Sequence, residues 1–376
     1  MKKIFISSGE HSGDLISSLL VAELQRMNID FFFYGIGGQN LENLGVKLIE
    51  NTVKYSSIGL VETFINIIPL FIKIKKIKSY LCKAEIDLFI AVDCRILNQI
   101  LLNYCIDQKI PFIYLCTPTK WWLYEQHQKS LNIISKAKKI YPAFKKEADY
   151  YQKHRIPAFF KGHPLKEHLL KTTKPHLKKD KKMIALFPGS RKQEVKELFP
   201  IFLDFIEMME KNNKNLTFYI AAATPLLHEY MKELIKKSNT KSDFKNLHFW
   251  EEHSIHLIQK SYFSIACSGS IAIEHCILQT PAIITYKVNK LSYFLAKKRL
   301  KKEKYISWPN ILSQKKILPE FIQDQAHAKN LYQHAIFWLE NKEAYQNCCH
   351  ELNLLQHHFG EKESLQEIAN DLIKYV

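Results

Sequence analysis

The chain has 376 residues, of which 47% are hydrophobic and 24% charged, and its formal net charge at pH 7 is +17. This composition excludes a disordered or fibrous chain, and the length suggests two domains of ~100–200 residues each. The excess of Lys and Arg favours anionic partners, which include nucleic acid, phosphorylated metabolites and acidic membrane surfaces.

The first half of the chain alternates apolar strand segments with amphipathic helices. The predicted strands are residues 3–7, 31–38, 85–93 and 110–118, and the predicted helices are 12–27 and about 97–107. Such near-continuous apolar strands, separated by helices, are typical of a parallel sheet covered on both faces. The N-terminus turns polar too soon for a signal peptide. No apolar run reaches the ~18–20 residues that are needed to span a bilayer.

The polar segment SSGEHSGD (7–14) connects the first predicted strand to the first predicted helix. A turn at this place faces the ligand side of a doubly wound sheet, and its two glycines allow a ligand to approach the backbone. Ser12 is placed to cap the helix through its hydroxyl, and Glu10 and Asp14 add carboxylates. A plain capped turn explains the pattern equally well. The glycines within 34–45 do not fit G-x-G-x-x-G, so we interpret them as a structural turn.

Asp93 ends the most apolar strand of the first half, within AVDCRILN (91–98). Catalytic groups gather at the carboxyl ends of parallel strands, and a partly desolvated carboxylate suits a general base. The structural alternative is an Asp that caps the following helix. We prefer the general base.

Residues 57–81 combine large apolar side chains with lysines. Four apolar residues from Leu70 to Leu81 form one stripe of a helix whose other faces carry lysines, and Pro69 is expected to kink or interrupt that helix. An apolar segment that merges into a lysine-rich amphipathic helix fits a surface that dips into an anionic membrane. The alternative, which is the commoner case, is a helix that packs on the core and exposes its lysines to solvent.

Residues 172–182 contain almost no apolar side chain, and we predict that they form a linker. The alternation of strands and helices then restarts. We therefore predict an α/β protein with two tandem doubly wound, Rossmann-like domains, over 1–171 and 172–344, followed by a helical end. Tandem units of this kind place a ligand cleft between the carboxyl edges of the two sheets.

The segment FPGSRKQEV (187–195) fills the first strand-to-helix turn of the second domain. The backbone N–H groups of Gly189 and Ser190, together with the Arg191 guanidinium, are expected to form a diphosphate site. Pro200 suits the first turn of the following helix, which we place from about residue 199.

A second turn with the same logic is ACSGSIAIEHC (266–276). Ser268, Gly269 and Ser270 follow a strand and open a helix. Glu274 lies one turn later, where a carboxylate suits the two hydroxyls of a ribose. Two such turns on one sheet edge indicate a nucleoside diphosphate site.

The remaining polar groups carry less information. His163 lies between Gly and Pro in KGHPL (161–165), where a His is more often structural than catalytic. Asn310, Glu320 and Gln323 are polar groups in an otherwise apolar region. The eight cysteines form no C-x-x-C pair, and most lie in apolar segments, so we interpret them as buried free thiols rather than metal ligands or disulfides.

Taken together, these motifs resemble the lipid-A-disaccharide synthase family. The resemblance rests on GEHSGD, GIGG, SIGLVE, VD with a following Asn, GHP, PGSRKQEV, SGSIAIE, LAKKRL, YISWPNIL and PEFIQ, in that order along nearly the whole chain. It implies the two-Rossmann (GT-B) glycosyltransferase architecture, with C-terminal helices from about 345–376 that cross back to the first domain. It also implies peripheral attachment to the cytoplasmic face of a bacterial inner membrane.

The implied reaction joins UDP-2,3-diacylglucosamine to 2,3-diacylglucosamine 1-phosphate (lipid X) with inversion, releases UDP, and requires no metal or other cofactor. The resemblance makes Asp93 and Glu10 the catalytic residues, with Asp93 as the preferred base for the acceptor 6-hydroxyl and Glu10 beside the acceptor as the alternative base. The implied UDP-binding residues are Gly189, Ser190, Arg191, Glu194, Ser268, Gly269, Ser270, Glu274, Asn310 and Gln323. The implied acceptor and membrane side includes Ser12, Asp14, Asn98, Phe64, Ile68, Phe71, Lys73 and Lys76.

The chain departs from the family pattern on the acceptor side. Ile96 stands where the family usually has a second Asp, Arg95 replaces a small residue or Pro, and the Trp-rich segment 120–127 lacks the usual Trp-x-Trp and Arg. Two other functions remain open. A UDP-sugar 2-epimerase shares the architecture but has no use for residues 57–81. An RNA-binding protein fits the net charge but calls for exposed aromatic and basic residues in alternation, which the sequence does not show.

Overall fold

The computed structural model describes residues 2–27, 29–53, 67–118, 128–212, 215–238, 244–289, 304–361 and 363–376, with backbone only for 67–71 and 128–129. Phe64 and the departures at 120–127 lie outside the described residues. The chain divides into two compact units. Unit 1 runs to His168 and resumes at His358, and unit 2 runs from Leu169 to His357.

Unit 1 contains a six-stranded parallel sheet in the order β3-β2-β1-β4-β5-β6. Its strands are β1 (Lys2–Ser7), β2 (Phe31–Gly37), β3 (Lys47–Asn51), β4 (Leu88–Val92), β5 (Phe112–Leu115) and β6 (Lys139–Tyr141). Its helices are α1 (His11–Gln25), α2 (Gln39–Asn43), α5 (Ile67–Ala84), α6 (Arg95–Asp107), α7 (Gln128–Ile134), α8 (Lys145–Lys153) and α18 (Ser364–Leu372). The helix α9 (Pro164–Thr172) spans the boundary between the units.

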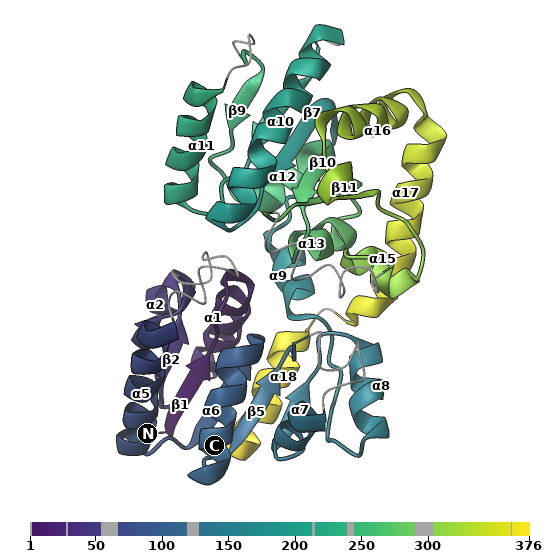
Figure 1. The fold of residues 1–376 in the computed structure, drawn as a ribbon. Coiled ribbons are helices and arrows are strands. Elements are labelled where there is room, and N and C mark those ends of the chain that lie inside the picture. The colour runs from purple at the N-terminus through teal and green to yellow at the C-terminus, as the bar shows by residue number, and fades with distance from the viewer. Residues whose placement is uncertain are drawn as a thin grey trace. The chain divides into compact units, whose positions relative to one another are not determined.

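Unit 2 contains a second six-stranded parallel sheet, in the order β12-β11-β10-β7-β8-β9. Its strands are β7 (Asp180–Phe187), β8 (Thr217–Ile220), β9 (Leu247–Phe249), β10 (Ser261–Cys267), β11 (Ala282–Tyr286) and β12 (Glu320–Ile322). Its helices are α10 (Lys192–Asn212), α11 (Pro225–Lys237), α12 (Ser254–Lys260), α13 (Ile271–Ile277), α15 (Trp308–Ser313), α16 (Ala328–Glu340) and α17 (Lys342–Leu354). Within each unit, helices flank the sheet on both faces (Figure 1).

The burial of the strands explains why the sequence forms these sheets. Every residue of β4 and of β10 is buried, as a parallel strand covered on both faces requires. The order in each sheet reverses direction beside its first strand, so the polar turns after neighbouring strands meet at one carboxyl edge. The prediction of two doubly wound, Rossmann-like units is confirmed.

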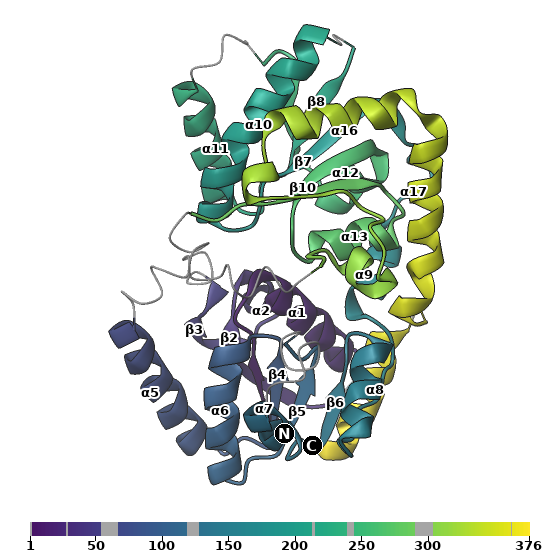
Figure 2. The same cartoon turned by 45° about the vertical axis from the view of Figure 1, so that its right-hand side comes forward.

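The C-terminal helices divide between the units. In unit 2, Tyr345 of α17 stacks on Tyr262 with ring centroids 4.0 Å apart and donates to its carbonyl oxygen. In unit 1, Asp371 of α18 accepts hydrogen bonds from Lys139 and Tyr141 of β6. Figure 2 shows α16 and α17 in unit 2 and α18 beside the strands of unit 1. The return of the chain to unit 1 therefore begins at residue 358, later than the expected 345.

Two predicted boundaries, the start of one helix and the length of the linker, differ in the structure. The helix expected from about residue 199 begins at Lys192, which places Pro200 inside α10 rather than in its first turn. The helix tolerates this proline because eight buried apolar residues, from Val195 to Met209, hold it on the sheet. The predicted linker is also shorter than 172–182, since α9 ends at Thr172 and β7 begins at Asp180.

The described part of the 57–81 segment is α5. It begins at Ile67, so Pro69 falls in the first turn, where its missing N–H has no helical partner. Ile74, Ile77 and Leu81 are buried, which is the core-facing arrangement. Among the described residues, no helix is both long and apolar enough to cross a membrane.

Candidate active site

The carboxyl edge of the unit 1 sheet brings together the turns that follow β1 and β4. These strands pair in parallel, with Ser7 opposite Ala91, so the GEHSGD turn lies next to Asp93. A Cβ atom built on Gly13 would lie 3.9 Å from the Cβ of Asp93. Tertiary structure therefore places Glu10 and Asp93, the two predicted acid-base residues, on adjacent turns.

Asp93 itself is held by its backbone. Its N–H donates to the carbonyl oxygens of Leu115 and Cys116, each at 3.2 Å. Its carbonyl oxygen accepts from Asn98 Nδ2 at 2.8 Å and from the hydroxyl of Tyr114. Asp93 has a φ of 45°, a left-handed conformation that few residues other than glycine adopt. The side chain is partly exposed, so the fold fixes the backbone and leaves the carboxylate at the sheet edge.

Asn98 is completely buried and bonds to the backbone of Asp93. Its amide nitrogen also donates to Val92 O at 3.1 Å, and its amide oxygen accepts from Ser7 Oγ at 2.5 Å. This side chain therefore ties the end of β1 to the end of β4. Asn98 was predicted to lie on the acceptor side, and its side chain is buried at the ends of these two strands.

Cys94 lies between the two turns and was not identified from the sequence. Burial raises its pKa to about 12, and the nearby charges of Asp93 and Glu10 add to this effect. The thiol is therefore uncharged at neutral pH. A Cβ atom on Gly9 would lie 2.1 Å from Cys94 Sγ and 2.9 Å from its Cβ, so Gly9 is required for close packing.

We expect Gly9→Ala to destabilise unit 1 by about 1–3 kcal/mol, because the added methyl group collides with Cys94. Cys94 has a φ of 46°, which glycine adopts without strain. Combining Gly9→Ala with Cys94→Gly should therefore restore most of the loss. Urea unfolding of the single and double variants measures both effects. If the changes in the free energy of unfolding of the two single variants simply add in the double variant, the two residues do not pack against each other.

Asp14 and Ser12 have structural positions that differ from the sequence prediction. Asp14 is buried and accepts from the backbone N–H groups of Gly38 and Asn40, at 2.6 and 3.0 Å, so it fixes the GIGG turn. The predicted Ser12 cap is wrong. The N-cap of α1 is Glu10, without a side-chain cap, and Ser12 already lies inside the helix.

The lysines of α5 lie near β3. Lys73 and Lys76 pair with Glu50 at 3.4 and 3.6 Å, and Lys76 also donates to the carbonyl oxygen of Ile49. Ile72 is 66% exposed. Ile68 and Phe71 belong to α5, but their side chains are not among those described.

The carboxyl edge of the unit 2 sheet joins the two predicted diphosphate turns. Phe187 of β7 is opposite Ala266 of β10, so PGSRKQEV and SGSIAIE follow neighbouring strands. Glu194 organises the first turn. Its carboxylate accepts from the N–H groups of Ser190 and Arg191, at 3.0 and 3.2 Å, and from the Arg191 guanidinium at 3.3 Å. The Ser190 N–H that we assigned to phosphate is thus already bonded within the protein.

Gly189 makes this arrangement possible. Its φ is 127°, and a Cβ atom there would lie 2.6 Å from the Glu194 carboxylate. Arg191 remains 35% exposed although it is paired, so its guanidinium is accessible at the sheet edge. Arg191 therefore presents a positive charge at this turn, and its ion pair with Glu194 holds the guanidinium there.

The second turn contributes Ser268, Gly269, Ser270 and Glu274. Ser268 Oγ donates to the carbonyl oxygen of Ile306, and Gly269 borders open space. Glu274 lies in the short helix α13, and burial raises its pKa to about 7. No described residue donates a hydrogen bond to its side-chain carboxylate, so its oxygens are available to hydroxyl groups of a ligand.

Asn310 and Gln323 both form hydrogen bonds within unit 2. Asn310 is fully buried, and its amide donates to Leu318 O and Glu320 Oε1 and accepts from the N–H groups of Ile317 and Leu318. These bonds use both donors and the whole acceptor capacity of the amide. Gln323 is 6% exposed and accepts from the Val288 N–H at 3.0 Å. Both side chains therefore shape the loops at this edge.

Glu320 is the centre of that loop network, which the sequence spacing did not reveal. Its carboxylate accepts from the N–H groups of Ile306 and Ser307, from Ser307 Oγ and from Asn310. His163 is also structural. Its ring is buried and its Nδ1 accepts from the Leu165 N–H, and burial lowers its pKa to about 3.

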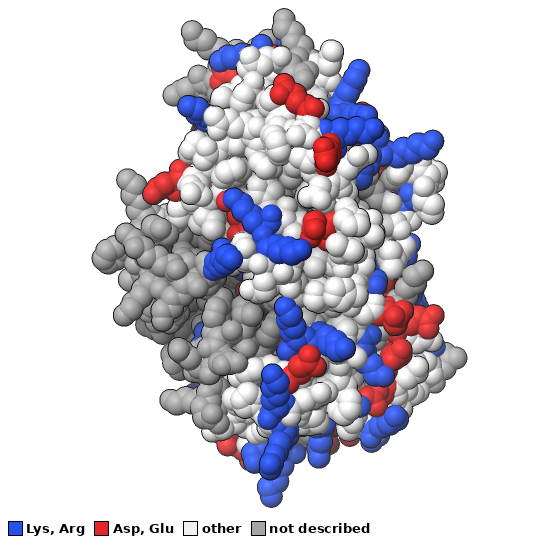
Figure 3. Space-filling model, turned by 90° about the vertical axis from the view of Figure 1, so that its right-hand side faces the viewer, with Lys and Arg blue, Asp and Glu red and all other residues white. Residues whose placement is uncertain are grey.

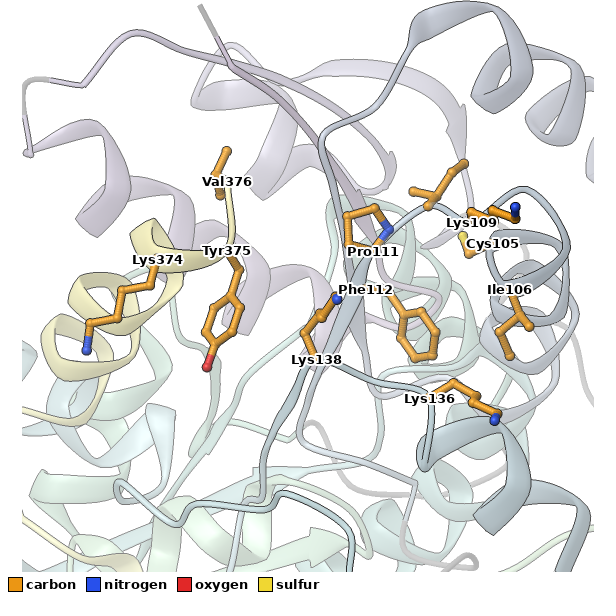
Figure 4. A pocket seen from close by; sticks show the side chains of 11 residues that line it. Cys105, Ile106, Lys109, Pro111, Phe112, Lys136, Lys138, Lys374, Tyr375 and Val376 are labelled. Atoms are coloured by element: carbon orange, nitrogen blue, oxygen red, sulfur yellow. The ribbon is translucent and has the colours of Figure 1, made fainter.

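A pocket of about 760 Å³ lies elsewhere in unit 1. Its lining includes Pro111, Phe112, Lys138 and Tyr375 (Figure 4). Phe112 begins β5 and Lys138 precedes β6, so this pocket is at the opposite edge of the sheet from Asp93. Its lining includes none of the residues that were predicted to form a site.

The charge of the described surface bears on the nucleic-acid alternative. Figure 3 shows Lys and Arg scattered together with Asp and Glu over the face in view. On this face, the basic side chains do not form the continuous stripe that follows a nucleic-acid backbone. The described residues also contain no group of three or more His, Cys, Asp or Glu side chains that could hold a metal ion.

Comparison with known proteins matches residues 4–373 to the family model described as lipid-A-disaccharide synthetase. The lipid-A-disaccharide synthase of Persephonella marina is 29% identical over 100% of this chain and 99% of its own length. That of Vibrio vulnificus is 28% identical, with coverage of 100% and 98%. Among solved structures, UDP-GlcNAc 2-epimerase from Neisseria meningitidis bound to UDP-GlcNAc aligns over both whole chains, with a TM-score of 0.66 and 15% identity.

Proposed function

The chain belongs to the lipid-A-disaccharide synthetase family and is a glycosyltransferase of lipid A biosynthesis, and from this premise we propose its reaction. It transfers 2,3-diacylglucosamine from UDP-2,3-diacylglucosamine to the 6-hydroxyl of 2,3-diacylglucosamine 1-phosphate. The products are the β-1,6 disaccharide 1-phosphate and UDP. The observation that carries this proposal is the family match over residues 4–373.

In the proposed mechanism, Asp93 is the general base. Its carboxylate accepts the proton of the acceptor 6-hydroxyl while the oxygen attacks the anomeric carbon of the donor, and the bond from that carbon to the UDP oxygen breaks. Attack from the side opposite the leaving group inverts the configuration. The backbone hydrogen bonds of Asp93 support this role, because they fix the residue at the carboxyl edge of the sheet.

Arg191 and Glu274 are the proposed UDP-binding groups of unit 2. The Arg191 guanidinium stabilises the negative charge that develops on the departing diphosphate, so the proposed reaction requires no metal ion or other cofactor. Glu194 holds that guanidinium through its ion pair. The Glu274 carboxylate accepts from the ribose hydroxyls, and the open space beside Gly269 admits the nucleotide.

The proposed acceptor is a lipid, so we also propose that unit 1 binds peripherally at the cytoplasmic face of the bacterial inner membrane. Ile72 and Lys76 of α5 are exposed and supply apolar and basic groups for an anionic surface. Flotation of the protein with anionic and with neutral vesicles tests this part. Equal flotation with both compositions would exclude an electrostatic contribution.

The turnover experiment uses purified protein with UDP-2,3-diacylglucosamine and lipid X, in the presence of EDTA, and follows UDP release. We expect one UDP for each disaccharide formed. A UDP-sugar 2-epimerase would instead convert UDP-GlcNAc without releasing UDP. The fold alone does not distinguish these two enzymes, because solved UDP-GlcNAc 2-epimerase structures, such as that from Neisseria meningitidis at 15% identity, share it.

We expect UDP to bind more tightly as the pH rises from 6 to 8, because only ionised Glu274, with a pKa of about 7, accepts both ribose hydroxyls. The affinity should increase by about tenfold over this range. Glu274→Gln should lose the part of this pH dependence that comes from Glu274. It should retain the smaller part that comes from ionisation of the UDP phosphate, which is the same for both proteins. Isothermal titration calorimetry at several pH values measures the difference. Parallel pH dependences of the two proteins would exclude Glu274 from the site.

A further inference from the structure

The turn after β5 is strained and carries part of the support of Asp93. Cys116 has a φ of 51°, although it is not a glycine, and it is buried. Its carbonyl oxygen accepts from the Asp93 N–H at 3.2 Å, and its own N–H donates to Tyr141 O at 2.9 Å. A left-handed residue of this type persists only where its surroundings hold it.

Buried side chains of Thr117 and of α8 hold this turn in its left-handed conformation. Thr117 Oγ1 donates to the Glu147 carboxylate and lies 2.6 Å from the Tyr151 hydroxyl. The second oxygen of Glu147 accepts from the Ala143 N–H at 2.9 Å. Glu147 and Tyr151 are both completely buried in α8, which lies beside β6 in unit 1 (Figure 2).

The cluster is directed at the turn rather than at a ligand. Its hydrogen bonds run from α8 to Thr117, whose neighbour Cys116 bonds to Asp93. The strand β5 contributes Tyr114 to the same end, through the hydroxyl that donates to the Asp93 carbonyl oxygen. A substitution at Glu147 is therefore expected to alter the position of Asp93, because the Cys116–Thr117 turn connects them.

We propose that Glu147 and Thr117 are positioning residues for the base Asp93: their buried hydrogen bond fixes the Cys116–Thr117 turn and so the direction of the Asp93 carboxylate. This inference rests on the proposed function, because it assigns the residues to the transfer reaction. Neither residue touches a substrate. Their loss should lower kcat and leave donor binding in unit 2 unchanged.

The test compares Glu147→Ala and Thr117→Val with the conservative variants Glu147→Gln and Thr117→Ser. We expect the first two to lower kcat for UDP release by about 10- to 100-fold, because a displaced base loses its alignment, with the KM of the UDP-sugar changed by less than about threefold. The conservative variants keep a hydrogen-bonding group at each position and should retain most of kcat.

Glu167→Ala is the matched control for lost stability. Glu167 is also a buried glutamate in the first turn of a helix, α9, but it accepts from the Leu365 N–H of α18. We expect it to lower the unfolding temperature by an amount similar to Glu147→Ala and to keep kcat within about twofold, because its bond does not lead to Asp93.

A second measurement does not depend on activity. Amide hydrogen exchange at Asp93 should become faster in Glu147→Ala and Thr117→Val, because its N–H bonds to the loosened turn, and should be unchanged in Glu167→Ala. Wild-type kcat and exchange in the first two variants would overturn the inference, as would an equal loss of kcat in Glu167→Ala. Absence of turnover in the wild type would instead contradict the proposed function.

Discussion

Asp93→Asn is expected to lower kcat for UDP release by about 10²–10⁴-fold, because the amide cannot accept the proton of the acceptor hydroxyl. Asparagine is the best replacement at this position. It tolerates the left-handed φ of 45° better than alanine, so the turn and its hydrogen bonds should persist. The KM for the UDP-sugar should change little, because the proposed donor residues belong to the other sheet.

Asp87→Asn is the matched control for this experiment. Asp87 precedes the same strand at its opposite end and accepts from the Lys3 N–H at 2.7 Å. We expect its kcat to remain within about twofold of wild type, because the group is far from the carboxyl edge of β4. Glu10→Gln separates the two candidate bases. A large loss in Glu10→Gln together with an active Asp93→Asn would transfer the role of base to Glu10.

Glu147→Gln is expected to change how the stability of unit 1 depends on pH. Burial raises the pKa of Glu147 to about 8, above its ordinary value of 4.5. The folded state therefore binds a proton that the unfolded state releases, and the resulting stabilisation is present below pH 4.5 and is lost as the pH rises towards 8. Between pH 5 and 8, the loss is on the order of 3–4 kcal/mol in the wild type.

The glutamine variant should not show this loss, since its amide carries no charge at any of these pH values. The groups that face Glu147 are Thr117, Cys116 and Tyr151, and burial raises the pKa of both titratable neighbours well above neutrality. Urea unfolding of wild type and variant at pH 5, 6, 7 and 8 measures the difference in slope. Identical slopes would show that Glu147 is ionised in the folded protein.

The comparison between two proteins is necessary because other buried groups titrate in the opposite direction. Burial lowers the pKa of His163 to about 3 and those of His275 and His334 to about 4. These rings are neutral in the folded state and gain a proton on unfolding below pH 6.5, so they destabilise the protein as the pH falls. Their contribution is the same in wild type and in Glu147→Gln, and it cancels in the difference.

The sequence alone predicted the sheets and the edges that carry the candidate residues. Apolar segments such as 85–93 and 110–118 alternate with helices in the pattern that is typical of parallel sheets covered on both faces. The polar turns after those strands then had to lie at the carboxyl edges. This is a local property of the chain, because strand periodicity and turn composition are readable from neighbouring residues. The family resemblance followed from the same turns, and the family match confirms it.

Tertiary structure decided what each polar side chain does at those edges. Asn310 looked like a ligand-binding group, yet its amide bonds to Ile317, Leu318 and Glu320. Gln323, predicted in the same role, uses its amide oxygen to accept from the Val288 N–H. Glu194 was predicted to lie beside the nucleotide, and its carboxylate binds the N–H groups of Ser190 and Arg191 in its own turn. Spacing along the chain does not reveal such partners, because a buried polar group is satisfied by whichever donor or acceptor the fold brings within about 3 Å.

Glu147 shows the limit most clearly. In the sequence it is one of several charged residues in KKEADYYQK and resembles a solvated helix position. In the structure it is completely buried, 30 residues from Thr117 along the chain, and it supports the turn that holds Asp93. The sequence by itself determined the two sheets, since these follow from local pattern, and it predicted the base that we propose. Only the tertiary structure decided which groups hold that base in place, because burial and hydrogen bonding join residues that are distant in sequence.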